Sequence, residues 1–548
     1  MKRTITIAIL ALALVPAAYL RLSACTNYLI TKGATVDGST IITYVADSHT
    51  LYGYLQRIPA GDHLEGTMVD VYEWDTGKYL GKIKQVRHTY EVIGNMNEHQ
   101  VSIGETTWGG REELTDTTAI VDYGSLMFLA LQRARTAREA IEVMTSLVAE
   151  YGYYSSGESF SIADPNEVWI MDMISKGPGN KGAVWVVRLI PDGYIAGHAN
   201  HPRIHQFPLN DPKTTLYAPD VISFAREKSY FKGTDAEFSF ANAYAPPDFG
   251  ALRFCESRVW NMFRRVTPDS KQMDAYEDYA MGENPKNVVP LWIKPDRKLS
   301  VRDVMELMRD HFEGTKMDMT KDVGAGPFIC PYRWRPMQWT LDSVKYINER
   351  AVSTQQTGFS FVAQMRSTLP DPIGGVFWFG VDDTYSTVYV PMYCGIHVVP
   401  KSYGVDAGDF YHFSWESAFW TFNWVSNWAY TRYCDMIHDI QVVQRELEGE
   451  FHARQPEIEQ NALEMYKESP EAARNYLTEY SVAQGDMVHK RWKTLGESLL
   501  CKYIDGNVKD EKGNVLHPRY PDAWYRVIVK ETGDHYKEKQ WETEKKTP

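Results

Sequence analysis

The chain has 548 residues, 44% of them hydrophobic and 24% charged, which is the composition of a globular protein too large for one ordinary core. Its net charge of −13 at pH 7 argues against nucleic acid as a partner, because binding phosphates requires a basic surface. The 6 cysteines include no C-x-x-C pair, so their spacing supports neither a metal site nor a redox motif, and no cofactor is expected.

Residues 1–24 have the layout of a secretory signal. A basic start precedes an apolar run from Ile5 to Leu20, and small residues end the segment. Pro16 and Arg21 cut this run short, whereas a membrane span needs about 20 apolar residues. We therefore expect the segment to be removed on export. The mature protein would then be periplasmic or extracellular, would have no membrane span and would begin at Cys25.

Cys25 has two competing interpretations. Leu22-Ser23-Ala24-Cys25 matches the lipobox of bacterial lipoproteins, in which the cysteine is lipidated and cannot act as a nucleophile. A lipoprotein usually continues as a polar tether, whereas Asn27 to Thr31 is already rich in strand-forming residues. The cysteine is therefore expected to be part of the fold. A lipid-anchored, peptide-binding surface protein without catalysis is the alternative from another class.

At the start of a mature chain, Cys25 would carry both a thiol and an α-amine. The thiol titrates near 8.5 and the amine near 7.7 to 8, so the amine can take the thiol proton at neutral pH. A glycine-containing turn follows the first predicted strand. Pairing Lys32 with Thr40 across this turn sets Cys25 opposite Asp47, which could orient the amine. The alternative for Asp47 is a solvated strand end.

The next elements alternate between strands, helices and strands. Turn signals between short apolar runs from Tyr52 to His88 predict antiparallel strands, and apolar residues at helical spacing from 124 to 150 predict two helices broken near Thr136. Two strand pairs follow, each around a turn signal: 158–163 with 168–173, and 183–190 with 194–199. This order predicts an α+β fold of antiparallel sheets covered by helices.

The C-terminal part is predicted to be mostly helical. Further strands at 357–399 complete a first unit, and an aromatic-rich helix at 410–433 indicates buried packing rather than a ligand site. A charged helical hairpin is predicted at 435–501. We therefore divide the mature chain into a domain at 25–400 and a helical extension at 401–548.

Three histidines are the best candidates for a metal site. His198, His201 and His205 lie close enough in the chain to bind zinc. However, there is no His-Glu-x-x-His motif and no acidic partner nearby, and a strand that ends before Pro202 need not direct them to one point. Hydrogen-bonded or surface histidines are the favoured interpretation.

Short motifs along the chain occur in the order found in one known family. They are Cys25-Thr26-Asn27, Asp37-Gly38-Ser39-Thr40, Ala46-Asp47-Ser48, Gly94-Asn95-Met96-Asn97-Glu98, Gly157 to Asp164, Ala199 to Ile204, and Ser257-Arg258-Val259-Trp260. Together they span most of residues 25 to 400. The chain resembles the cysteine dipeptidase family of the N-terminal-nucleophile (Ntn) hydrolase class, which is related to penicillin V acylase and bile salt hydrolase.

The resemblance implies a fold and a set of roles. The fold is a four-layer αββα sandwich, which periodicity alone does not predict. Cys25 matches the nucleophile and Asp47 the carboxylate that holds its amine. Asn200 matches the side chain that stabilises the oxyanion, and Arg258 the arginine beside the nucleophile. The second oxyanion donor of the family is a backbone N–H that falls near Thr106.

The resemblance also implies an activity. It is that of an exported cysteine-type dipeptidase that hydrolyses small peptides through a thioester intermediate. An amidase of the same class that acts on non-peptide amides is the alternative. Many relatives carry arginine where this chain has Tyr44, so either the substrate contact differs or another cation substitutes. Without the family context, an ion pair with Glu256 or another acid is the simplest expectation for Arg258.

Overall fold

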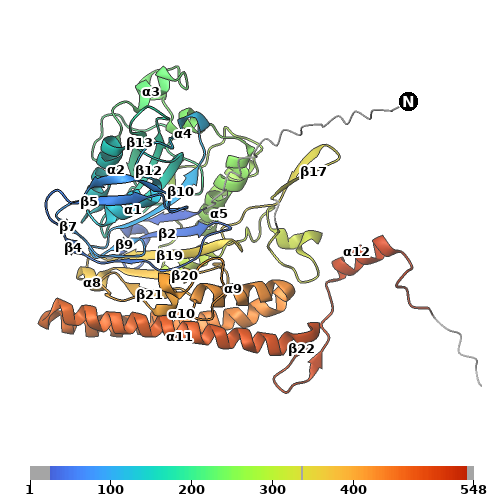
Figure 1. Cartoon of the computed structure of the whole chain (residues 1–548). Coiled ribbons are helices and arrows are strands. Elements are labelled where there is room, and N and C mark those ends of the chain that lie inside the picture. The colour runs from blue at the N-terminus through green and yellow to red at the C-terminus, as the bar shows by residue number, and fades with distance from the viewer. Residues whose placement is uncertain (1–24, 335–336, 540–548) are drawn as a thin grey trace, which may run out of the picture.

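The computed structural model describes residues 25–334 and 337–539, and the predicted signal segment lies outside them. Two antiparallel sheets form the centre of the described part, and helices lie along their outer faces (Figure 1). The predicted α+β class, with antiparallel sheets and a helical C-terminal region, is confirmed. Within the described residues, we find no helix with the length and apolar character that a membrane crossing requires.

The first sheet has seven strands among the described residues, in the order β16-β14-β1-β2-β19-β20-β21. In that order they are Trp292–Ile293, Ile195–His198, Asn27–Ile30, Thr40–Asp47, Thr357–Met365, Val376–Val381 and Val390–Tyr393. β1 is an inner strand, paired with β14 on one side and with β2 on the other. Cys25 immediately precedes β1 and is therefore held at the centre of the fold rather than on a free end.

The second sheet has eight strands within the described residues, in the order β15-β13-β12-β11-β10-β9-β8-β3. In that order they are Thr215–Tyr217, Ala183–Leu189, Val168–Ser175, Gly157–Ala163, Ser102–Trp108, Met96–Asn97, Val92–Ile93 and Arg57–Ile58. Smaller ladders are formed by β4 (Gly61–Asp62) with β7 (His88–Thr89), β5 (Met68–Tyr72) with β6 (Tyr79–Lys84), β17 (Gln338–Leu341) with β18 (Val344–Ile347), and β22 (Val508–Lys509) with β23 (Val515–Leu516). The strands predicted between residues 52 and 88 are thus present.

The two sheets face each other through strands that are buried on both sides. Every residue of β1, β2, β11 and β12 is buried. β1 contacts β10, β11 and β12 across the interface, and β2 contacts β10 and β11. Such strands have long runs of apolar residues instead of a strict alternation, because neither of their faces meets water. The interface between the sheets is where the candidate site lies.

Helices cover the outer sides of both sheets. The α-helices of the described residues are α1 Tyr123–Leu131, α2 Ala137–Tyr151, α3 Val221–Glu227, α4 Phe240–Tyr244, α5 Ser257–Val266, α6 Glu277–Ala280, α7 Val301–Met308, α8 Asp371–Gly374, α9 Ala418–Ala429, α10 Tyr433–Glu468, α11 Pro470–Tyr503 and α12 Asp522–Thr532, of which α12 lies apart from the sheets (Figure 1). α1 and α2 contact the second sheet, whereas α9, α10 and α11 contact the first. Figure 1 shows α10 and α11 as a long pair along the first sheet.

Two predictions about helices are confirmed. The break between α1 and α2 falls at Thr136, whose hydroxyl accepts a hydrogen bond from Glu139 N–H at 3.2 Å and so caps α2. The aromatic residues of α9 serve packing: Phe419 and Phe422 are buried, and Phe422 stacks on Trp492 of α11 with ring centroids 4.5 Å apart.

The pairing of β1 with β2 differs by one residue from the predicted register. The observed partners are Thr26↔Val45, Leu29↔Ile42 and Ile30↔Ile41. Extended by one residue, this register places Cys25 opposite Ala46 rather than Asp47. A 3₁₀ turn at Lys32–Ala34 precedes β2, so Lys32 does not pair with Thr40. Asp47 therefore lies one position further along β2 than the residue directly opposite Cys25.

The second predicted strand pair is divided between the two sheets. β11 and β12 form the expected hairpin, but β13 pairs within the second sheet and β14 pairs with β1 in the first. The turn at residues 191–193 therefore crosses from one sheet to the other. Because β14 runs antiparallel to β1, the residues that follow β14 lie beside the start of β1, close to Cys25.

Two buried ion pairs attach α10 to the sheets. Arg309, next to α7, donates to Glu448 at 2.6 Å, and Arg366, next to β19, donates to Glu459 at 2.6 Å. The side chains of Arg309 and Glu448 are only 4% and 7% exposed. The boundary between a domain at 25–400 and an extension at 401–548 stays a prediction, and these contacts join its two sides.

Glu448→Ala is expected to lower the free energy of unfolding by about 3 kcal/mol, because it leaves the Arg309 charge buried without this partner. Urea-induced unfolding measures the change. Glu464→Ala on the same helix is the matched control, since the ion pair of Glu464 with Lys467 is exposed. The control is expected to change stability by about 0.5 kcal/mol or less. Equal losses in the two variants would refute the structural role of the Arg309 pair.

Candidate active site

Cys25 lies between the two sheets, immediately before β1. Its Sγ is 3.7 Å from the hydroxyl of Tyr44 on β2 and 3.8 Å from Oε1 of Glu105 on β10. The Tyr44 hydroxyl donates a hydrogen bond to the same Glu105 oxygen. All three residues are buried. The sulfur therefore contacts one hydroxyl and one carboxylate, one from each sheet.

Arg258 on α5 ties the backbone of Cys25 to Asn200. Its Nη1 donates to Cys25 O at 2.5 Å and to Thr26 Oγ1 at 2.6 Å, and its Nη2 donates to Asn200 Oδ1 at 2.8 Å. A guanidinium presents its donors in one plane and in a fixed geometry, so it sets the positions of these groups relative to one another. The structure thus brings together three residues that the sequence singled out.

Arg258 keeps its positive charge although it is buried. Burial and the neighbouring Arg350 lower the pKa of Arg258 to about 10, so the guanidinium is still protonated at neutral pH. The expected ion pair with Glu256 is not formed within the described residues, because Glu256 instead accepts from Arg203 at 3.1 Å. A cation held at the backbone of a cysteine favours the thiolate over the thiol.

Asn200 is held on both sides of its amide. Oδ1 accepts from Arg258, and Nδ2 donates to Thr107 O on β10 at 2.6 Å. The backbone of Asn200 has a φ of 57°, a left-handed conformation that asparagine adopts more readily than most residues. The residue follows β14 directly, so the crossing between the sheets positions this amide beside Cys25.

The direction of the backbone groups along β10 distinguishes Thr106 from Thr107. Thr106 is buried, and its hydroxyl is bonded to His198 Nδ1 at 2.7 Å. Thr107 O points toward Asn200. In an antiparallel strand, the N–H and C=O of one residue point to the same edge, and successive residues alternate. The Thr107 N–H therefore lies on the edge of β10 that faces Asn200, and the oxyanion role expected near Thr106 stays a prediction.

Asp47 ends β2 and is fully buried, so it is not a solvated strand end. Its carboxylate accepts from Thr357 Oγ1 at 2.6 Å and forms an ion pair with Arg350. Burial raises the pKa of Asp47, while Arg350, Thr357 and the charge of Arg258 favour the ionised carboxylate. Asp47 thus belongs to the same electrostatic cluster as Arg258.

Arg350 was not found by the sequence reasoning. It lies 303 positions from Asp47 in the chain and belongs to none of the recognised motifs, so no local signal marked it. Many relatives have an arginine at the position of Tyr44, and the sequence left open whether another cation takes its place in this chain. Arg350 is a candidate for that cation. Tyr44 contacts Glu105 through its hydroxyl and packs edge-on against Phe359 and Phe361, whereas Arg350 supplies a cation at Asp47.

Glu105 and Glu158 form a second feature that was missed. Both carboxyl groups are buried in adjacent strands, β10 and β11. Burial raises the pKa of Glu105 to about 7 and raises that of Glu158 well above its usual range. The available signal was an acidic residue inside each of two otherwise uncharged strands, which is rare unless the group has a partner or a function.

The three candidate histidines do not converge. His198 lies between Thr106 Oγ1 and Ser161 Oγ, at 2.7 and 2.8 Å, whereas His201 and His205 bond to Ala245 O and Ser239 Oγ. Burial lowers the pKa of His198 to about 3, so its ring is neutral. No group of three or more His, Cys, Asp or Glu side chains that could hold a metal ion occurs in the part of the chain that the structure describes.

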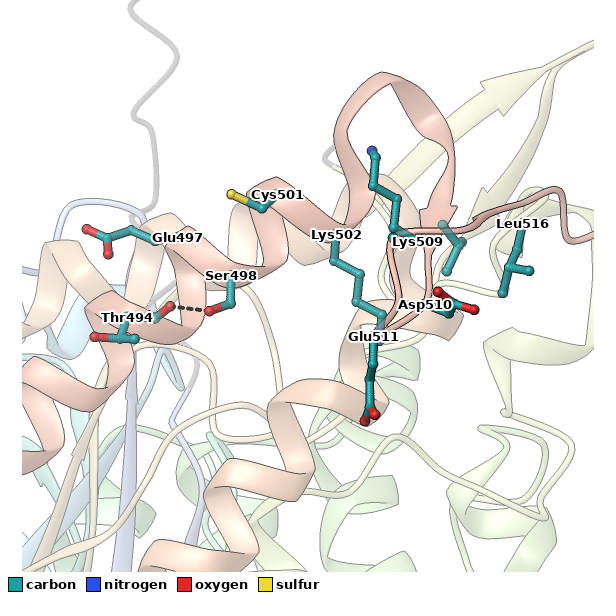
Figure 2. Close-up of a pocket in the computed structure, with 11 residues that line it drawn as sticks. Thr494, Glu497, Ser498, Cys501, Lys502, Lys509, Asp510, Glu511 and Leu516 are labelled. Carbon is teal, nitrogen blue, oxygen red and sulfur yellow. Dashed lines mark hydrogen bonds between the residues drawn. The ribbon is translucent and has the colours of Figure 1, made fainter.

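A separate surface hollow lies at the end of α11, beside β22 and β23 (Figure 2). Thr494, Ser498 and Cys501 of α11 line it together with residues of the β22–β23 hairpin. It shares no residue with the cluster around Cys25. Cys501 is exposed.

Comparison with known proteins assigns the family. Residues 56–446 match the family model described as Peptidase family C69. This match covers most of the chain, and the chain therefore belongs to peptidase family C69. The matched segment contains Asn200 and Arg258, whereas Cys25 and Asp47 precede it.

Similar proteins carry related names over comparable lengths. A probable dipeptidase of Latilactobacillus sakei is 24% identical over 404 residues, covering 70% of this chain and 77% of the relative. A probable dipeptidase of Salmonella dublin is 24% identical over 395 residues, covering 68% and 81%. A probable dipeptidase B of Streptococcus pyogenes serotype M1 is 22% identical over 509 residues, covering 89% and 94%. The resemblance inferred from short motifs is confirmed.

Proposed function

We propose that this protein is an exported cysteine-type dipeptidase whose nucleophile is Cys25. The observation that carries the proposal is the hydrogen-bond network of Arg258, which joins the nucleophile's backbone to Asn200 where the two sheets meet. The chain's membership of a peptidase family and the names of its relatives support hydrolysis of peptides. Small peptides are accordingly the proposed substrates.

The proposal extends to the fold. Two facing antiparallel sheets with helices on their outer sides have the layers expected of an Ntn-hydrolase sandwich. Residues 25–400 would form this catalytic unit, and residues 401–548 a helical extension packed on the first sheet. In such a sandwich the nucleophile stands at the start of an inner strand. The position of Cys25 before β1, which lies between β14 and β2, fits this arrangement.

Removal of residues 1–24 would create the reactive group. The α-amine of Cys25 would then be free to take the thiol proton, giving a thiolate and an ammonium on the same residue. Asp47 would hold this ammonium, and the charge of Arg258 would favour the thiolate. Export and processing would thus switch on the chemistry.

In the first half of the reaction, the thiolate attacks the scissile carbonyl carbon and the carbonyl electrons move onto oxygen. The Asn200 amide and a backbone N–H of β10 near Thr106, for which the neighbouring Thr107 N–H is also a candidate, would donate to this oxyanion. Each such donor contributes about 3 kcal/mol to the stability of the transition state. When the intermediate collapses, the C–N bond breaks, the leaving amine takes the proton from the Cys25 ammonium, and a thioester forms.

In the second half, a water molecule attacks the thioester carbonyl and gives its proton to the α-amine of Cys25. The C–S bond then breaks, which releases the carboxylic acid product and restores the thiolate with its ammonium. One water is consumed for each peptide bond that is cleaved, and no oxidant or metal takes part in these steps.

Mass spectrometry of the secreted, active protein tests the proposal. We expect a mature chain that begins with an unmodified Cys25 and hydrolyses dipeptides. A fully active chain that still carries residues 1–24, or one with a lipid on the Cys25 sulfur, would rule out the proposed nucleophile. An active enzyme with free Cys25 that cleaves only non-peptide amides would establish the amidase instead.

A further inference from the structure

A pair of buried carboxyl groups lies beside the nucleophile. Glu158 pairs with Thr107 across β10 and β11, and Glu105 precedes Thr107 by two residues, so both glutamates project from the same face of the second sheet. Glu105 contacts Cys25 Sγ at 3.8 Å. Oε2 of Glu158 is buried and accepts no hydrogen bond from any donor in the described residues. Ionising the Glu158 carboxyl group is therefore costly, because no donor faces this buried oxygen.

The two carboxyl groups together carry at most one negative charge at neutral pH. Burial and the charge of Glu105 raise the pKa of Glu158 well above its usual range, while the pKa of Glu105 is raised to about 7. Two carboxylates this close do not both ionise readily, because their charges repel. A cation placed between the two carboxyl groups would offset their mutual repulsion, so that both could ionise, and would satisfy the oxygen lone pairs that have no donor.

This acidic pair does not assist the thiol. A negative charge next to a cysteine disfavours the thiolate, whereas Arg258, on the other side of the residue, favours it. The carboxylate at 3.8 Å from the sulfur therefore opposes the chemistry of Cys25 unless something positive lies against it when the reaction occurs. The substrate of a peptidase carries such a group at its N-terminus.

We propose that Glu105, supported by Glu158, binds the α-ammonium group of the substrate. The enzyme would then accept peptides with a free N-terminus and cleave the peptide bond that follows their first residue. The inference rests on the proposed function and specifies its substrate class. No relative's name and no recognised motif role assigns this task to either glutamate.

The distances permit this arrangement. The ammonium nitrogen of a peptide is two bonds, or about 2.5 Å, from the carbonyl carbon of the same residue. A sulfur poised for attack lies about 3 to 3.5 Å from that carbon, so the nitrogen falls within about 6 Å of the sulfur. Glu105 Oε1, at 3.8 Å from the sulfur, can reach this nitrogen with an ordinary charge-assisted hydrogen bond of about 2.8 Å.

The first test uses the wild-type enzyme with mature Cys25. An equimolar pool of Ala-Xaa and Xaa-Ala dipeptides is compared with the same pool after N-acetylation, and products are quantified by liquid chromatography and mass spectrometry. We expect the free dipeptides to react at least about 100-fold faster, as loss of a buried charge pair predicts. Equal rates for the two pools would overturn the inference and leave the proposed function standing. Hydrolysis of neither pool would refute the proposed function itself.

The second test is Glu105→Gln, which keeps the shape of the side chain and an acceptor for Tyr44. We expect kcat/KM for free dipeptides to fall about 100-fold and kcat/KM for acetylated dipeptides to stay the same or rise, because glutamine no longer disfavours the thiolate. A similar fall for both would show that Glu105 acts on Cys25 or on the fold, and would refute substrate recognition. Asp75→Asn is the matched control, because Asp75 is exposed and its negative charge contributes to the raised pKa of Glu105.

The pH dependence of the wild type gives a readout that needs no variant. The ratio of kcat/KM for free over acetylated dipeptides cancels the titration of Cys25, which both substrates share. Since the pKa of Glu105 is about 7, the ratio is expected to rise as the pH increases through 7, where Glu105 loses its proton and the substrate ammonium is still charged. A ratio that does not change between pH 6 and about 7.5 would count against an ion pair between Glu105 and the substrate ammonium.

Discussion

Cys25→Ala is expected to abolish peptide hydrolysis while the protein remains folded. The alanine removes the only group in the proposed mechanism that forms a bond to substrate, so kcat/KM should fall by at least about 10⁴-fold. The rate is measured with the dipeptide that the wild type cleaves fastest. Circular dichroism and the thermal midpoint should stay close to those of the wild type, because alanine fits the space of a buried cysteine with little strain.

The control for this variant is Cys501→Ala, which changes an exposed thiol in the hollow at the end of α11. It is expected to keep full activity. Both proteins are first examined by mass spectrometry, so that an effect on processing is separated from an effect on chemistry. Residual turnover above about 1% in a correctly processed Cys25→Ala protein would remove Cys25 from the mechanism.

Arg258→Met and Arg258→Lys are expected to separate two contributions of this residue. Methionine removes both the charge and the hydrogen bonds to Cys25 O and Asn200, so kcat/KM should fall about 10²- to 10³-fold. The pH at which iodoacetamide alkylates Cys25 should also rise by about one unit, because a nearby cation has been lost. Lysine keeps the charge but lacks the planar donor geometry. It should therefore leave the alkylation profile near that of the wild type while hydrolysis still falls.

Arg264→Met is the matched control on the same helix, since Arg264 contacts Asn261 and Glu313 rather than the site. Its alkylation profile and activity should resemble those of the wild type. An unchanged profile in Arg258→Met would show that Arg258 does not tune the thiol. Full activity in Arg258→Lys would show that the fixed position of Asn200 is unnecessary.

Predictions that depended on neighbouring residues agreed with the structure. The cap at Thr136 and the hairpin between β11 and β12 arise from contacts within a few residues, and the aromatic residues of α9 are concentrated in one short stretch of sequence although they pack on distant partners such as Trp492. The positions of Cys25, Asn200 and Arg258 came from motifs, and the structure places them in one network. Their catalytic roles stay predictions.

Predictions that depended on register or on distant partners did not succeed to the same degree. The turn before β2 shifted the pairing of Cys25 by one residue, and the predicted hairpin at residues 191–193 became a crossing between sheets. Arg350 forms an ion pair with Asp47, and no local sequence signal had marked it. Glu158 became a candidate only when β10 and β11 were seen to place it on the same face as Glu105.

The amino-acid sequence alone determined the α+β class, the order of the elements and the family, because local periodicity, turn residues and short motifs are written in consecutive positions. The tertiary structure decided which charges meet at the nucleophile. Arg350 and Asp47 are 303 positions apart, and Arg258 and Cys25 are 233 apart. Burial then changes the chemistry of such groups, since the same carboxyl group titrates differently beside an arginine, beside another carboxylate or in water.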